Sequence, residues 1–210
     1  MYVPPHFRKD ERTALHQAIR DARLATIVTL GNEGLEASHV PVLLDAADGP
    51  HGAIRGHLAK ANAQWRCPAR GTEALAIVLG PDAYVSPAWY PTKRETGRVV
   101  PTWNYVAVHA YGPIEFFEDS ERLLPIVTAL TERLEAGRPE PWAVTDAPAD
   151  YIQAQLKGIV GFRLAIARLE GKWKLSQNRS EADRRGVIAG LEGEGGPLET
   201  EIARLMRETT

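Results

Sequence analysis

The feature that most constrains the fold is a series of short apolar stretches that follow one another at hairpin spacing. The first two, 24–30 and 35–44, flank the turn-forming sequence Gly-Asn-Glu-Gly at 31–34. Only short helical patterns separate the later strands, and no regular strand–helix–strand repeat is present. The pattern predicts an antiparallel β-barrel in an α+β chain. The further expected strands are 52–54, 73–79, 83–86, 99–117 and 161–169.

Helical periodicity and capping residues predict short helices around these strands. The sequence Gly80-Pro81-Asp82 is expected to turn the chain between two of the strands. Near the end, Leu198, Ile202, Leu205 and Met206 form an apolar stripe that is expected to dock on the body of the protein or on a partner. The expected helices are 10–23, 59–67, 119–136 and 151–157, followed by two helical stretches on either side of 193–197.

Composition limits the classes of function. The chain has 210 residues, of which 44% are hydrophobic and 25% charged, and its formal net charge of −2 argues against a broad nucleic-acid-binding face. A local basic patch at Arg179, Arg184 and Arg185 is still compatible with DNA contact. Cys67 is the only cysteine, so no intrachain disulfide can form; we expect an inert thiol and a cytoplasmic protein. No apolar run approaches the length of a membrane span.

The segment Arg55-Gly56-His57-Leu58-Ala59-Lys60-Ala61-Asn62 lies where an expected strand leads into an expected helix. The first turn of a helix carries free N–H groups and a partial positive charge, so Arg55 and Lys60 there could seat a phosphate. A solvated turn with basic side chains is the alternative.

Two other segments are rich in binding groups. On the expected strand 99–117, Trp103, Tyr105, His109 and Tyr111 share one face, which suits stacking on a planar ligand, a subunit interface or an aromatic core. The segment 171–179 combines lysines, a tryptophan, a serine and amides, which could close over a phosphate or form a basic surface turn.

Several other chemistries lack their motifs. The chain has no Gly-rich phosphate loop, no Gly-x-Ser-x-Gly nucleophile elbow and no pair of histidines at helical i,i+4 spacing. A metal site built from His39, His57 and His109 has little support, and we predict none. No catalytic residue can be assigned from the sequence.

Taken in order, the motifs resemble those of the PaiB-type FMN-binding negative transcriptional regulators. Val-Pro-Thr-Trp-Asn-Tyr and Lys-Leu-Ser-Gln-Asn are the most specific strings. The resemblance implies an antiparallel split β-barrel of the FMN-binding type, with peripheral helices and a helical C-terminal appendage. It also implies a homodimer with FMN at the subunit interface. The split-barrel domain would span 1–191 and a helical tail 192–210. The segments that carry the resemblance are 2–7, 55–65, 80–90, 100–105 and 172–179.

Carried onto this chain, the resemblance implies a cofactor site in two parts. One part would hold the FMN phosphate and ribityl chain, with further polar contacts from the preceding strand. The other would approach the ring across the dimer and close the site. Ala59 stands where split barrels prefer a serine or threonine, so one phosphate contact must come from elsewhere. The first part comprises Arg55, His57, Lys60 and Asn62 with Ser38 and His39; the second comprises Trp103, Asn104, Lys174, Ser176 and Gln177.

Three functions remain open at this level. The first is a dimeric FMN-binding regulator that contacts DNA directly or through a partner. The second is an FMN-dependent oxidoreductase or a haem-degrading split-barrel enzyme, in which His57 or His109 could donate a proton or bind haem. The third is a barrel that has lost its flavin and serves as an interaction module.

Overall fold

The computed structural model describes residues 1–31, 34–66 and 73–209. The centre of the expected 31–34 turn and Cys67 lie outside the described residues. The chain divides into two compact units. Unit 1 comprises Met1–Glu11, Leu79–Val108 and Glu170–Thr210, and unit 2 comprises Arg12–Val78 and His109–Leu169.

Unit 2 contains the barrel sheet. Its hydrogen-bonded strands follow the order β3-β2-β6-β7-β8-β5-β4, and β6 and β7 also run into unit 1. Among the described residues this path ends at β3 and β4, so the sheet is split rather than closed. The registers of β2 with β3, β4 with β5 and β5 with β8 are antiparallel, as expected. The elements are α1 (Arg12–Asp21), β2 (Ala25–Gly31), β3 (Gly34–Val40), β4 (Val42–Asp45), β5 (Ala53–Ala59), β6 (Glu73–Val85), β7 (Thr102–Phe117) and β8 (Ile159–Ala165).

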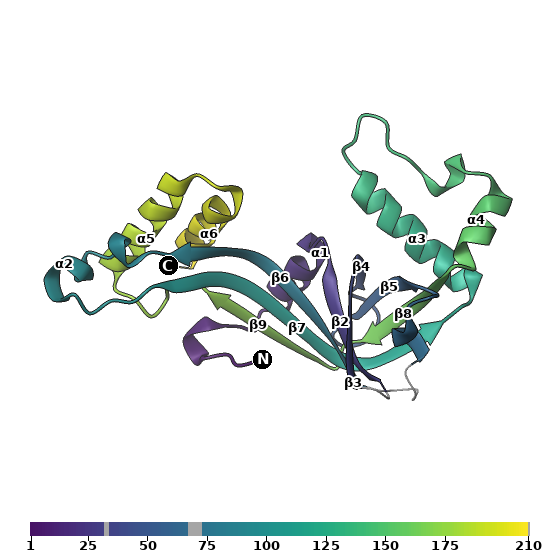
Figure 1. Cartoon of the computed structure of the whole chain (residues 1–210), viewed down its shortest axis with the longest axis horizontal. Helices are drawn as coiled ribbons and strands as arrows, with labels where there is room; N and C mark the ends of the chain where they lie inside the picture. Colours follow the sequence, from purple (N-terminus) through teal and green to yellow (C-terminus); the bar gives the residue numbers. More distant parts are fainter. Residues whose placement is uncertain (32–33, 67–72, 210) are drawn as a thin grey trace. The chain divides into compact units, whose positions relative to one another are not determined.

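Two helices cover part of this sheet. Helix α3 (Ser120–Glu135) confirms the expected helix at 119–136, and its N-cap Asp119 accepts a hydrogen bond from the Glu121 amide. Its buried face packs on β4, β5 and β8, and α4 (Ala149–Leu156) packs on α3 and β8 (Figure 1). A short 3₁₀ helix, η4 (Val144–Asp146), also contacts α3. The buried residues of α3 are Leu123, Ile126 and Leu130.

The expected single strand at 35–44 is wrong, because it is two strands with different partners. Strand β3 pairs with β2, whereas β4 pairs with β5. Pro41 lies between them. Proline has no N–H to donate to a ladder, so pairing is interrupted there and the chain can change partners.

The expected turn at Gly80-Pro81-Asp82 is also wrong, because β6 continues without a break from Glu73 to Val85. Gly80 serves packing instead. A Cβ added there would lie 2.9 Å from the Cβ of Val106, closer than side chains tolerate. The glycine thus lets β7 approach β6 rather than ending the strand.

Unit 1 combines the far parts of β6 and β7 with β9 and the C-terminal helices. Strand β1 pairs antiparallel with β9, which places Arg8 opposite Lys172. The expected strand at 161–169 is two strands, β8 and β9, separated after Ala165. The remaining elements of unit 1 are η1 (Pro5–Phe7), β1 (Arg8–Lys9), η3 (Pro87–Trp89), α2 (Thr92–Thr96), β9 (Arg168–Lys174), α5 (Glu181–Glu194) and α6 (Pro197–Glu208).

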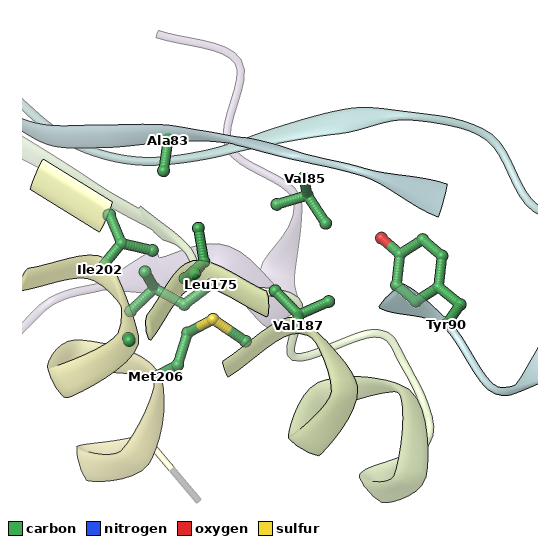
Figure 2. Close-up of a cluster of buried hydrophobic side chains, with 9 residues drawn as sticks. Ala83, Val85, Tyr90, Leu175, Val187, Ile202 and Met206 are labelled. Atoms are coloured by element: carbon green, nitrogen blue, oxygen red, sulfur yellow. The ribbon is translucent and has the colours of Figure 1, made fainter. Parts of the chain in front are cut away.

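The core of unit 1 joins strand and helix side chains. Ala83 and Val85 of β6 face side chains of α5 and α6, as Figure 2 shows. Ile202 and Met206 are fully buried, so the expected apolar stripe docks on the body of the chain, although Leu198 is half exposed. The expected boundary between 191 and 192 stays a prediction. The core consists of Ala83, Val85, Tyr90, Leu175, Val187, Leu191, Ile202, Ala203 and Met206.

Across the described parts of the chain, no helix combines the length and the apolar character needed to cross a membrane.

Candidate functional site

Strand β5 carries the first candidate residues on one face. Arg55 and His57 are two positions apart, so their side chains leave the same side of the sheet, whereas Ile54, Gly56 and Leu58 are buried on the other side. In the register with β8, Arg55 lies opposite Arg163 and His57 opposite Gly161. The alternating pattern therefore positions a cation and an imidazole side by side.

The expected helix at 59–67 is wrong, and with it the helix N-terminus that was expected to seat a phosphate. After β5 the chain makes a turn, and only the 3₁₀ helix η2 (Ala63–Arg66) follows in the described residues. The Lys60 amide donates to the Gly158 carbonyl at 2.8 Å. This segment therefore offers side chains rather than a helix dipole to a ligand.

A hydrogen-bond network fixes this turn against β2 and β3. The Asn62 side-chain amide donates to the Ser38 hydroxyl at 2.8 Å, and the Asn62 side-chain oxygen accepts from the Gln64 amide at 2.9 Å. Gln64 is 1% exposed, and its side-chain amide donates to the carbonyls of Ile27 and Glu36 at 2.8 and 3.2 Å. The structure thus joins Ser38 and Asn62, two of the predicted cofactor residues, directly, and their contact with a cofactor stays a prediction.

Gln64 was missed in the sequence because glutamine has no preference that marks a buried role. Its context offered one signal, since it follows Asn62 by two residues at a strand end, where amides commonly satisfy backbone groups. Its side-chain oxygen is buried and has no hydrogen-bond partner among the described residues.

The two predicted cations already have carboxylate partners, and the partners differ. The Arg55 Nη2 lies 2.8 Å from Asp48 and 3.0 Å from Asp45, whereas Lys60 forms an ion pair with Glu118. Arg163 also binds Asp48, with its Nε donating at 2.7 Å. The charge of each cation is therefore balanced within unit 2.

Asp48 and Arg163 were missed because they belong to a loop and a strand that carried no motif. Hydrogen bonds from Arg163, and next from Arg55, hold the pKa of the Asp48 carboxyl well below its usual range. The same hydrogen bond from Arg163 to Asp48 raises the pKa of the Arg163 guanidinium. The sequence offered one signal for Arg163. It lies between apolar residues on β8, so its side chain should leave the sheet on the opposite face from theirs, which is the face that carries Arg55.

His57 is the most distinctive group of this face. Burial lowers the pKa of its imidazole, which favours the neutral ring. Its Nδ1 is buried and has no hydrogen-bond partner within the described ranges. Buried polar atoms usually have a partner, and an atom without one is often satisfied by a ligand or water.

His39 does not join Ser38. Burial alternates along β3, so adjacent residues face opposite sides, and His39 lies on the more exposed one. Its Nδ1 lies 2.8 Å from the Thr26 hydroxyl across the strand pair. A cofactor contact by His39 stays a prediction.

The second group of candidates, all in unit 1, is bonded internally. Asn104 is fully buried, and its side-chain amide donates to the Ser176 hydroxyl at 3.0 Å. The Ser176 hydroxyl also lies 3.1 Å from the Asn104 side-chain oxygen. Ser176 has a φ of 61°, a left-handed conformation that a serine rarely adopts without support. These two residues connect β7 to the turn after β9.

Gln177 and Lys174 are likewise used within unit 1. The Gln177 side chain accepts from the Leu175 amide at 2.7 Å and donates to the Trp173 carbonyl at 2.6 Å. Lys174 donates to the Thr102 hydroxyl and to the Trp103 carbonyl. Burial, followed by the charges of Lys172 and Arg179, lowers the pKa of the Lys174 ammonium.

Trp103 differs from the rest of this group. It is 53% exposed and meets Tyr84 edge-on, with the ring centroids 6.0 Å apart. Its neighbour Asn104 is buried on the other side of β7, so the two cannot present their side chains in one direction. Trp103 thus lies on the exposed side of β7, where the aromatic face was predicted. A role of Trp103 in binding stays a prediction.

The predicted basic patch loses one member. Arg184 is 9% exposed, and its guanidinium donates to the Met206 carbonyl at 2.7 Å near the end of α6. Arg185 is exposed and pairs with Glu181, and Arg179 lies over the Tyr90 ring at 5.0 Å. Arg184 therefore serves the interior of unit 1.

The side chains of unit 2 fit the polar part of FMN, the cofactor that the resemblance implies. Two buried side-chain atoms, His57 Nδ1 and Arg55 Nε, have no partner in the described chain. The Ser38 hydroxyl and the Asn62 amide lie together beside the turn. Hydroxyl, amide, imidazole and guanidinium groups are the donors and acceptors that a ribityl chain and a phosphate require.

Comparison with known proteins agrees with this chemistry. A family model described as "Putative FMN-binding domain" matches residues 1–168. The protein "Protease synthase and sporulation protein PAI 2" of Bacillus subtilis is 35% identical over 208 residues, covering 99% of this chain and 97% of that protein.

Solved structures share the fold at low sequence identity. The FAD and haem binding protein of Mycobacterium smegmatis superposes with a TM-score of 0.58 at 20% identity, covering 87% of this chain and 80% of that one. The flavocytochrome Anf3 of Azotobacter vinelandii has a TM-score of 0.60 at 14% identity, covering 82% and 72%. These likenesses and the split antiparallel sheet confirm the expected fold class. The chain belongs to the FMN-binding split-barrel family that includes PaiB.

Proposed function

We propose that this protein binds FMN through the β5 face of unit 2 and acts, as a homodimer, as a negative transcriptional regulator of the PaiB type. The observation that carries the binding proposal is the buried, unpartnered Nδ1 of His57 in the described structure, beside the unpartnered Nε of Arg55. A bound flavin supplies redox chemistry. The protein's own groups bind and orient it.

Ser38, Asn62 and His57 would hold the polar chain of the cofactor. Ser38 and Asn62 are held by each other, so they need little reorganisation to present a hydroxyl and an amide. His57 is kept neutral by burial, so it can act as a donor or an acceptor without a change in net charge.

Lys60 would reach the phosphate by exchanging its partner. Its ion pair with Glu118 is partly exposed, with the two side chains 47% and 46% exposed. Exposed pairs contribute little to stability, so opening this one costs little against a charge-assisted contact with a phosphate. Arg55, tied to two carboxylates, is the less available cation.

Titration of the purified protein with FMN, followed by quenching of flavin fluorescence, tests this site. Lys60→Ala should weaken binding by roughly 1.5–3 kcal/mol, because a charge-assisted contact is lost. Lys93→Ala, at an exposed lysine of α2, is the matched control and should bind as the wild type does. Equal affinity in Lys60→Ala would remove Lys60 from the site. If the wild-type protein does not bind FMN, the binding proposal is wrong, and the remaining hypothesis is a barrel that serves as an interaction module.

The homodimer and the regulatory role rest on different support. An exposed pair of aromatic rings, Trp103 and Tyr84, is the kind of anchor that subunit interfaces use, and sedimentation velocity measures the oligomeric state directly.

The regulatory role rests on the relationship to the Bacillus protein. With a formal net charge of −2, contact with DNA would need a local patch or a partner. Binding to duplex DNA at graded salt concentrations tests direct contact.

The single cysteine supports a reducing, cytoplasmic location.

An FMN-dependent oxidoreductase is the second candidate, and His57 is the observation that favours it. A neutral imidazole buried on the face that would hold a flavin is placed to relay a proton. Oxidation of NADH or NADPH by the FMN-loaded protein, abolished in His57→Leu, would support this class. A haem-degrading enzyme is the less supported version of this second candidate. A Soret band on addition of haemin would show that the protein binds haem.

A further inference from the structure

Strand β9 carries two lysines of unit 1 whose charges are not balanced by carboxylates. Lys172 and Lys174 are two positions apart, so their side chains leave the same face of the strand. Lys172 donates to the Tyr2 carbonyl at 3.2 Å, and Lys174 donates to the Thr102 hydroxyl and the Trp103 carbonyl. These acceptors are all neutral. Neither lysine forms an ion pair within the described chain, so both charges remain uncompensated.

Lys172 is also buried, with 8% of its surface exposed. An ammonium group has three N–H donors, and the Tyr2 carbonyl accepts one of them. The ammonium lies 5.1 Å from the centroid of the Tyr105 ring and 5.6 Å from that of the Tyr2 ring. Such rings attract a cation but do not neutralise it. Buried charges are almost always paired with an opposite charge, so Lys172 is a candidate partner for an anion.

Two further cations lie near the lysines. Arg8 is directly opposite Lys172 in the register of β1 with β9, so the two side chains leave the same face. Arg8 is exposed and has no carboxylate partner among the residues that the structure describes. Burial, and then the charges of Lys172 and Arg179, lower the pKa of the Lys174 ammonium. These three cations are therefore close enough to repel one another.

The carboxylate on the same face of β9 does not balance this charge. Glu170 is two positions before Lys172, but it forms an ion pair with the N-terminal ammonium of Met1. The cluster thus differs from the arginines of unit 2, where Asp48 is shared by Arg55 and Arg163.

An aromatic ring is available beside these cations. The Tyr2 side chain is 83% exposed, although its ring and its carbonyl both contact Lys172. Planar bases stack on exposed aromatic rings. Ammonium groups are compact point charges that suit phosphate, and a phosphate monoester carries about −1.5 to −2 charges at neutral pH. Such a group balances several cations better than one carboxylate does.

We propose that this face of unit 1 binds a nucleoside monophosphate. The phosphate contacts Lys172, Lys174 and Arg8, and the base stacks on the Tyr2 ring. All four residues belong to unit 1, so the site is separate from the β5 face of unit 2 that is proposed for the flavin. Of the four, Lys174 alone was among the predicted cofactor residues.

Isothermal titration calorimetry of the full chain with AMP, at low salt and without FMN, tests the proposal. Adenosine lacks the phosphate and ribose 5-phosphate lacks the base, so these two ligands test the two halves of the site. Arg8→Gln and Tyr2→Ala change exposed side chains, and Lys172→Met removes the buried charge but keeps a long apolar side chain. Arg94→Gln, at an exposed arginine of α2 in unit 1, is the matched control.

AMP should bind the wild type and Arg94→Gln equally. Its dissociation constant should rise about tenfold in Arg8→Gln and in Lys172→Met, because each variant loses a charge-assisted contact. It should rise severalfold in Tyr2→Ala, which loses the stacking surface. Adenosine and ribose 5-phosphate should each bind at least about tenfold more weakly than AMP. Without ligand, Lys172→Met should melt no lower than the wild type, because it removes an unbalanced buried charge.

The proposal is overturned if AMP does not bind, if adenosine or ribose 5-phosphate binds as tightly as AMP, or if Arg8→Gln and Lys172→Met leave its affinity unchanged. Displacement of AMP by FMN would assign these cations to the flavin phosphate, which also overturns it. The FMN titration of the wild type and of Lys60→Ala tests the proposed function separately, so either proposal can fail alone.

Discussion

The two parts of the predicted cofactor site use similar residue types in opposite ways. In unit 1 the Asn104 and Ser176 side chains bond to each other, and the Gln177 side chain bonds to its own turn. In unit 2 the Ser38 and Asn62 side chains also pair, but His57 and Arg55 beside them keep buried atoms with no described partner. Polar side chains that are satisfied internally support a fold, whereas buried polar atoms without a partner leave hydrogen-bonding capacity that a ligand could use.

A similar contrast holds for charge. The arginines of unit 2 share carboxylates, and Asp48 alone serves two of them. In unit 1 the pKa of the Lys174 ammonium is lowered, mainly by burial. The charges of Lys172 and Arg179 lower it further. Both of the most specific strings, Val-Pro-Thr-Trp-Asn-Tyr and Lys-Leu-Ser-Gln-Asn, thus lie in the unit whose amide and hydroxyl groups are used for structure.

Asn104→Ala should have the largest effect on stability. It leaves a cavity in unit 1 and removes the partner of the buried Ser176, so the free energy of unfolding should fall by about 2–4 kcal/mol. Urea unfolding followed by circular dichroism measures this. Asn178→Ala, at an exposed asparagine of the same turn, should change stability by less than about 0.5 kcal/mol.

The same variant separates the two roles of Asn104. If Asn104 is structural, the folded fraction of Asn104→Ala should bind FMN as the wild type does. A variant of normal stability that fails to bind FMN would make Asn104 a direct cofactor contact and reverse the contrast between the two units.

Asp48→Asn should have a smaller but clear effect, because it removes the shared partner of Arg55 and Arg163. We expect a loss of about 1–3 kcal/mol in the free energy of unfolding at neutral pH. The folded pKa of Asp48 is lowered, so its contribution is present above the unfolded pKa of about 3.9 and disappears as pH falls below it. Stabilities of variant and wild type should therefore converge in acid. Asp82→Asn, at an exposed aspartate, is the control. A gap that persists unchanged in acid would show that the carboxylate charge is not responsible.

His57→Leu should have the smallest effect, visible as a change in pH dependence. The folded pKa of His57 lies below its unfolded value of 6.5, so the unfolded state takes up the proton first as pH falls. The wild type should lose stability as pH drops through this value, and His57→Leu should lose less. Melting temperatures at pH 7.5 and 5.5 measure the difference. His6→Leu, at an exposed histidine, should follow the wild type. Parallel curves for all three proteins would place the acid sensitivity elsewhere.

The sequence predicted the sheet better than it predicted the breaks in the sheet. Alternation along 24–30 and capping by Asp119 are local signals, and β2 and α3 follow them closely. Pro41 and Gly80 look alike as breakers, yet the first separates two strands and the second lies inside one. The difference depends on Val106, which packs against Gly80 from another part of the chain and leaves no local mark.

The candidate site was predictable only in part for the same reason. The resemblance named Ser38 and Asn62 as members of one cofactor site, but it did not predict the hydrogen bond that joins them. The burial of Gln64 and the shared role of Asp48 arise from residues far apart in sequence that the fold brings together. The helix expected after β5 failed because Gly158 accepts the Lys60 amide from a neighbouring strand end, which competes with a helical turn.

The core of unit 1 has a consequence for what counts as the domain. The family match ends at residue 168, yet Leu175, Val187 and Met206 fill the space against Ala83 and Val85. A protein cut after the matched region would leave Ala83 and Val85 of β6 open to water, and an exposed apolar strand surface tends to aggregate. Expression of the shorter piece is therefore a poor route to a working flavoprotein, and families defined on it should be extended to include the closing helices.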